Sequence, residues 1–143
     1  MMKKTILLLI FCIFGSVTTL ANELVSKTAE GAKVYFITPA NGQTVSGEFK
    51  VQFGLSGMGV APAGSKVKNT GHHHILINKD ASEINLTRPL PSTDQIKHFG
   101  GGQTETVLKL PKGKYTLQLL LGNYAHIPHD KPLISENITI TVE

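Results

Sequence analysis

The sequence predicts an all-β protein, an immunoglobulin-like antiparallel β-sandwich of about seven strands. Two observations support this class. Short runs of alternating apolar and polar residues recur along the chain, separated by Gly, Pro and Asn. No stretch shows the spacing of a long amphipathic helix. The length of 143 residues, 41% of them hydrophobic, suits one domain with a packed core. A small barrel is the alternative all-β architecture.

The first 21 residues have the pattern of a bacterial secretory signal peptide. Lys3 and Lys4 precede a continuous apolar run over residues 6–14, and the small residues Thr19 and Ala21 follow. The run is too short to span a bilayer as a stable helix, although an uncleaved anchor is the alternative. We therefore expect residues 22–143 to form a single β-sandwich domain that is periplasmic or secreted, with no membrane span after cleavage.

Cleavage after Ala21 changes the composition of the chain. Its one cysteine, Cys12, is removed, so no disulfide, thiolate metal site or cysteine nucleophile remains. The loss of two lysines leaves 12 basic and 10 acidic side chains, a net charge of +2. This small charge argues against a nucleic-acid partner.

The predicted strands of the first half are separated by clear turn signals. Residues 33–38 alternate and end at a turn over residues 39–42. Residues 48–55 form a half-buried strand with one apolar face, made by Phe49, Val51, Phe53 and Leu55. A Gly-rich loop over residues 56–71 leads to a third strand at residues 72–78.

The second half continues the pattern. Residues 83–86 are expected to form a short edge strand, followed by a long loop at 87–102. We expect residues 104–110 and 115–121 to pair as a hairpin around the turn Pro111-Lys112-Gly113-Lys114. After a third loop at 122–132, residues 134–142 form the last strand.

Six histidines are the most informative feature of the sequence. His72, His73 and His74 open the third strand, His98 precedes the strand at 104, and His126 and His129 follow the strand that ends at 121. In an immunoglobulin-like order, the strand at 72 is the antiparallel neighbour of the strand at 115. This topology places all six histidines at one end of the sandwich.

The spacing of these histidines favours a metal site. On a strand, His72 and His74 point to one face, while His73 points to the other face together with Ile75 and Ile77. Imidazole suits zinc, copper and nickel, and Cu(II) binds most tightly to such ligands. A thioether from Met58, in the loop before this strand, would favour copper further.

Several residues have a structural alternative. His73 suits a packed core histidine, His98 a loop cap, and Met58 a core filler. His126 and His129 can instead bond backbone carbonyl groups. Glu105 and Asp130, near the histidines in sequence, are candidates to orient a ligating ring or to bind the ion directly.

Three His-bearing blocks also resemble a known bacterial secreted family. The blocks are Gly71-His72-His73-His74-Ile75-Leu76-Ile77, His98-Phe99-Gly100-Gly101-Gly102-Gln103-Thr104-Glu105, and Tyr115-Thr116-Leu117-Gln118-Leu119 leading to His126-Ile127-Pro128-His129-Asp130. They resemble the domain of unknown function 4399, over nearly all of the mature chain. Asn78 departs from the acidic residue expected after the apolar run. The resemblance implies a secreted β domain with a shared histidine-rich end, and it carries no activity with it.

The sequence therefore predicts a periplasmic protein that binds a transition metal, copper first and zinc next. The predicted ligands are His72, His74, His126 and His129, with His98 and Met58 in reserve and His73 structural. Such a protein binds, buffers or delivers the ion, with a periplasmic protein as the candidate partner. The sequence favours this binding role over that of an enzyme. A metal-dependent enzyme would need an open coordination position and a general base, for which Glu105 is the candidate. The main alternative is an interaction module in which the same loops bind a peptide, a glycan or a partner protein.

Overall fold

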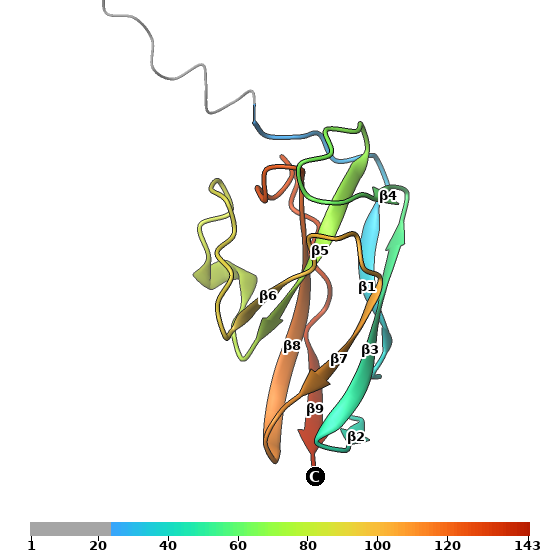
Figure 1. The fold of residues 1–143 in the computed structure, drawn as a ribbon, viewed down its shortest axis with the longest axis vertical. Helices are drawn as coiled ribbons and strands as arrows, with labels where there is room; N and C mark the ends of the chain where they lie inside the picture. Colours follow the sequence, from blue (N-terminus) through green and yellow to red (C-terminus); the bar gives the residue numbers. More distant parts are fainter. Residues whose placement is uncertain (1–23) are drawn as a thin grey trace, which may run out of the picture.

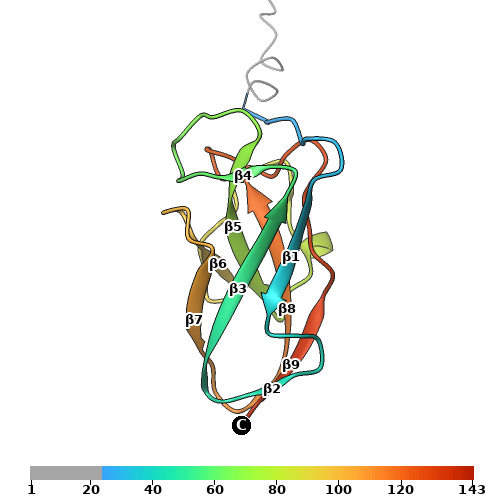
Figure 2. The same cartoon turned by 90° about the vertical axis from the view of Figure 1, so that its right-hand side faces the viewer.

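The computed structural model describes residues 24–143, which form a two-layered β-sandwich (Figures 1 and 2). The predicted signal peptide, residues 1–21, lies outside the described residues. One layer is a three-stranded antiparallel sheet in the order β1-β3-β7. Its strands are β1 (Lys33–Thr38), β3 (Glu48–Ser56) and β7 (Glu105–Lys109).

The second layer is a six-stranded sheet in the order β2-β9-β8-β5-β4, with β6 also pairing β5. Its long members, β5 (Thr70–Ile77), β8 (Gly113–Gly122) and β9 (Ile138–Val142), are antiparallel. The short strands β2 (Thr44–Val45) and β4 (Gly59–Val60) pair in parallel with β9 and β5. β6 (Ile96–His98) is antiparallel to β5.

The core lies between the two sheets. The inward face of β3 supplies Phe49, Val51 and Phe53, as its alternation predicts, and these pack in one cluster with Ile75 and Leu119. Two sheets packed face to face around one such core make an immunoglobulin-like sandwich. The predicted fold class is therefore confirmed. Within residues 24–143 no helix is long and apolar enough to cross a membrane.

The predicted hairpin is wrong, because β7 and β8 lie in different sheets. β7 pairs only with β3, whereas β8 lies between β5 and β9. Residues 117–122 of β8 are all buried, as expected for a central strand that is hydrogen-bonded to a neighbour on each edge. β7 exposes one face, with Val107 56% exposed, and suits the edge of the smaller sheet.

Other differences concern short segments. The edge strand expected at 83–86 is replaced by a 3₁₀ turn, Ala81–Glu83, which Asp80 and Glu83 stabilise by capping each other's backbone N–H groups. The last strand is shorter than expected and begins at Ile138. β2, β4 and β6 were missed because two or three residues are too few to show periodicity.

Candidate metal centre

Strand β5 presents its histidines to both faces of the six-stranded sheet. The ring of His73 enters the core and lies 5.0 Å from the ring of Phe53, centroid to centroid. On the other face, the rings of His72 and His74 lie 4.9 Å apart. All three side chains are fully buried. The period of two that the sequence predicted is thus confirmed by these contacts.

β6 brings His98 to the same face. His98 pairs directly opposite His74 in the antiparallel register. Its ring centroid lies 5.0 Å from that of His72 and 5.1 Å from that of His74. The expected convergence of His98 with the β5 histidines is therefore found, but through β6 rather than through a hairpin with β8.

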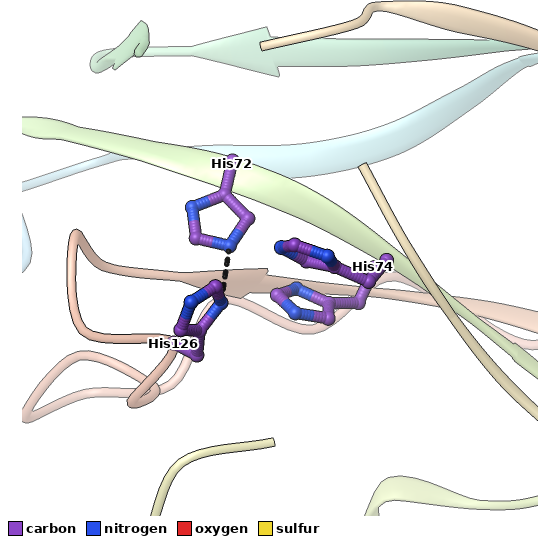
Figure 3. Close-up of side chains that lie close together, drawn as sticks. His72, His74 and His126 are labelled. Atoms are coloured by element: carbon purple, nitrogen blue, oxygen red, sulfur yellow. Dashed lines mark hydrogen bonds between the residues drawn. The ribbon is translucent and has the colours of Figure 1, made fainter. Parts of the chain in front are cut away.

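His126 completes the group from the turn that follows β8. Its Nδ1 lies 3.2 Å from the Nε2 of His72 (Figure 3), and its ring centroid lies 4.7 Å from that of His98. The backbone N–H of Leu90, in the loop before β6, donates to the carbonyl of His126 at 2.9 Å. The backbone of His126 has a φ of +62°, a conformation that is uncommon for residues other than glycine and often marks a functional site.

These four side chains lie close enough to one another to hold one metal ion. One ring nitrogen from each of them lies within 4.8 Å of the others, and we call this set the four-histidine group: His72, His74, His98 and His126. A tetrahedral ion with Zn–N bonds of about 2.0–2.1 Å separates its ligand nitrogens by about 3.4 Å. The ring nitrogens lie up to 4.8 Å apart, so the side chains would turn toward the ion when it binds. No Asp, Glu or Cys among residues 24–143 belongs to the group.

Several ring nitrogens of the group lack a hydrogen-bond partner, although Nε2 of His72 faces Nδ1 of His126. Nδ1 of His72, both nitrogens of His74 and Nε2 of His98 are buried and unpaired. Buried polar groups are normally paired, because an unmade hydrogen bond costs about 1–3 kcal/mol. Four imidazoles that face one another, with four of their nitrogens buried and unpaired, have the donor chemistry of a transition-metal site.

Burial keeps the rings of His72 and His74 neutral. Loss of solvent, with a smaller contribution from the neighbouring histidines, lowers the pKa of His72 to about 4 and that of His74 to about 3. Loss of solvent also lowers the pKa of His98, and the neighbouring His126 makes a second, smaller contribution in the same direction. A neutral imidazole has a free lone pair, so His72 and His74 need lose no proton to bind an ion at neutral pH.

Glycines make room for two of the rings. A Cβ atom on Gly122 would lie 2.8 Å from Cε1 of His74, and a Cβ atom on Gly100 would overlap the ring of His98. Both imidazoles therefore lie directly against backbone. The glycine at the start of the run Gly100-Gly101-Gly102 thus leaves space for the His98 ring.

Two of the predicted ligands lie outside the group. His129 is buried, and its Nε2 faces the carbonyl oxygen of Thr70 at 3.2 Å, which matches its structural alternative. Met58 packs against the core between the sheets rather than beside the four-histidine group. His98, held in reserve at first, takes a place in the group.

The two candidate carboxylates have other partners. Glu105, on the three-stranded sheet, accepts hydrogen bonds from Gln52 at 2.9 Å and Lys50 at 3.3 Å, which lower its pKa. Asp130 accepts hydrogen bonds from Thr28 N and Lys27 Nζ, both at 2.9 Å. Neither carboxylate belongs to the four-histidine group.

The fold and the site together define a class: an immunoglobulin-like β-sandwich with four converging histidines on the outer face of its larger sheet. The family model of the domain of unknown function DUF4399 matches residues 51–143, a segment that contains the whole four-histidine group. The chain belongs to this family, as the histidine blocks predicted. No curated protein matches the sequence. Among solved structures, the chain is similar to the solution structure of the PKD domain (329-428) from human KIAA0319, with 13% identity, 90% of this chain and 89% of that chain covered, and a TM-score of 0.39.

Proposed function

We propose that this protein binds one divalent transition-metal ion, copper(II) in preference to zinc, at the four-histidine group. The observation that carries the proposal is the convergence of four imidazoles, two of them fully buried, on one face of the six-stranded sheet, with four of their ring nitrogens buried and unpaired. The protein would hold or deliver the ion in the periplasm, where the predicted signal peptide would send it.

The chemistry of the four ligands determines which metal ion the site is expected to prefer. An all-imidazole site suits copper, zinc and nickel, and the intrinsic affinity of nitrogen ligands is greatest for Cu(II). Within residues 24–143 no thiolate belongs to the group, and the thioether of Met58, which would favour Cu(I), packs against the core between the sheets. Copper is therefore proposed as Cu(II), with Zn(II) as the next candidate.

Burial favours metal binding over an interaction module. The side chains of His72 and His74 are fully buried, so they cannot contact a peptide, a glycan or a partner protein without a rearrangement of the fold. His98 and His126 are partly exposed, and they give a small ion a route from solvent to the buried pair.

The ligand count favours binding over catalysis. Zinc sites with four protein ligands are structural, whereas catalytic zinc sites keep one position open for water. The group has four imidazoles and no carboxylate to serve as a general base. Copper or zinc held in this way would be stored or passed on rather than used in a turnover.

Metal titration tests the proposal. The chain from Asn22 onward, without a His tag, is titrated with Cu(II) and Zn(II) by calorimetry, beside its His72→Ala, His98→Ala and His129→Ala variants. We expect one ion per chain and a loss of affinity of at least tenfold in the first two variants. His129→Ala is the matched control and should keep the wild-type affinity. Only millimolar binding, or equal losses in all three variants, would refute the site.

A further inference from the structure

Asn123 is the residue around which the turn bearing His126 is built. It directly follows β8, and its side chain is fully buried. Its side-chain Oδ1 accepts hydrogen bonds from the backbone N–H of Ala125 at 2.8 Å and of Ile127 at 3.1 Å. Its backbone carbonyl accepts from the N–H of His126 at 2.9 Å, and its own N–H donates to the carbonyl of Ile127 at 2.8 Å. The backbone N–H groups of three successive residues, 125–127, therefore all bond to Asn123.

These hydrogen bonds fix an unfavourable backbone conformation. His126 has a φ of +62°, which residues with a side chain adopt only where the surrounding contacts enforce it. This conformation brings Nδ1 of His126 to 3.2 Å from Nε2 of His72. Without the amide of Asn123, the turn loses the hydrogen bonds that select this conformation, and the ring of His126 no longer points toward the four-histidine group.

The other end of the same amide holds the amino-terminal segment. Nδ2 of Asn123 donates to the carbonyl of Leu24 at 2.7 Å and to Oγ of Ser26 at 3.1 Å. The segment is tied to the same loop a second time, because the N–H of Asp130 donates to the carbonyl of Ser26 at 3.0 Å and Asp130 accepts from Thr28 N. All four capacities of the Asn123 amide are used, two for the turn and two for the segment behind it.

We propose that Asn123 is the positioning residue of the metal centre: it holds His126 as the fourth ligand and links the ligand turn to the amino-terminal segment. The proposal rests on the metal site proposed above. Partners that orient a ligand typically contribute ten- to a hundredfold to metal affinity. Loss of the Asn123 amide should therefore convert a four-nitrogen centre into a three-nitrogen centre.

A double-mutant cycle on Cu(II) binding tests this role. We expect Asn123→Ala to lower Cu(II) affinity by about ten- to a hundredfold. Its Cu(II) electron paramagnetic resonance spectrum should shift to that of His126→Ala. In the His126→Ala background, the same substitution should change affinity by less than about twofold, because the residue acts only through His126. A wild-type spectrum in Asn123→Ala, or an undiminished effect in the double variant, would overturn the proposal.

A matched control separates positioning from stability. Asn41 also uses its side-chain oxygen to accept a backbone N–H, that of Thr139 at 2.8 Å, on β9. Asn41→Ala should lower the melting temperature and leave the copper spectrum unchanged. If Asn123→Ala fails to fold, Ser26→Ala removes only one partner of the amide and should shift the spectrum in the same direction to a smaller extent. An unchanged spectrum in that variant would count against the link to the amino-terminal segment.

A metal-free measurement distinguishes failure of this proposal from failure of the metal site. The contact between His126 and His72 exists without any ion, so the ¹⁵N chemical shifts of the His126 ring report it in the apo protein. We expect these shifts to move toward those of a free imidazole in Asn123→Ala and to stay in Asn41→Ala. Wild-type protein without metal affinity would refute the proposed function, whereas unmoved ring shifts in Asn123→Ala would refute the positioning role.

Discussion

His73 should contribute to the acid sensitivity of the fold, and replacing it by leucine should remove that contribution. Its imidazole is fully buried between the sheets beside Phe53, and neither ring nitrogen has a hydrogen-bond partner. Burial lowers its pKa from 6.5 to about 4. Leucine is similar in size and has no group to protonate, so His73→Leu isolates the contribution of this ring.

The magnitude follows from proton linkage. The unfolded chain takes up a proton on this ring near pH 6.5, whereas the folded protein does so only near pH 4. The unfolded state therefore binds more protons between these values, and the free energy of unfolding falls as the pH falls. At pH 5 the loss is about 2 kcal/mol, since each unit of pH below 6.5 costs about 1.4 kcal/mol. Above pH 6.5 the effect vanishes.

Urea unfolding of apo protein at pH 7.5 and pH 5, with chelator present, measures this effect. The free energy of unfolding should fall by about 2 kcal/mol more in the wild type than in His73→Leu. His72 and His74 remain in both proteins, so their own contributions cancel in the comparison. Equal losses in the two proteins would show that His73 is not held neutral in the core, and the reasoning would fail.

Three further predictions concern the metal centre. In a competition assay, Gly122→Ala should weaken Cu(II) binding at least tenfold, because its Cβ would lie 2.8 Å from the His74 ring. Gly59→Ala is the control, since its Cβ makes an ordinary contact at 3.5 Å, and equal Cu(II) affinities in the two variants would contradict the prediction. Met58→Leu and Glu105→Gln should each bind Cu(II) within about twofold of wild type in the same assay, since Met58 packs against the core and Glu105 lies outside the four-histidine group. A larger loss of affinity in either variant would place its side chain among the ligands. Cu(II) affinity at pH 5.5 should stay within about a hundredfold of that at pH 7.5, since burial lowers the pKa of two rings to about 4 and about 3. Four ordinary imidazoles would lose about 10⁴-fold over that range, and a loss of that size would contradict the burial argument.

The part of the site that follows from local geometry could be predicted from the sequence. Alternation along one strand fixed which faces His72, His73 and His74 occupy, because the period of a strand does not depend on its neighbours. The antiparallel pairing of β5 with β8 followed from the immunoglobulin-like order, and it brings His72 opposite Gly122. This pairing placed the turn with His126 near the start of β5.

The remaining features depend on contacts that are distant in sequence. His98 is positioned by β6, a strand of three residues that pairs with the edge of β5 opposite to β8. The hairpin prediction failed because a short turn between two alternating strands looks the same whether the strands pair or cross between sheets. Which of His126 and His129 joins the four-histidine group depends on the turn that Asn123 stabilises. The hydrophobic periodicity of the sequence does not predict this turn.

X-ray absorption spectroscopy of the Cu(II)-loaded chain tests the central claim most directly. We expect a first shell of nitrogen ligands at about 2.0 Å with the multiple-scattering pattern of four imidazoles, reduced to three in His98→Ala. A sulfur ligand, or a shell of mainly oxygen ligands with fewer than three imidazoles, would contradict the assignment of the metal centre to His72, His74, His98 and His126.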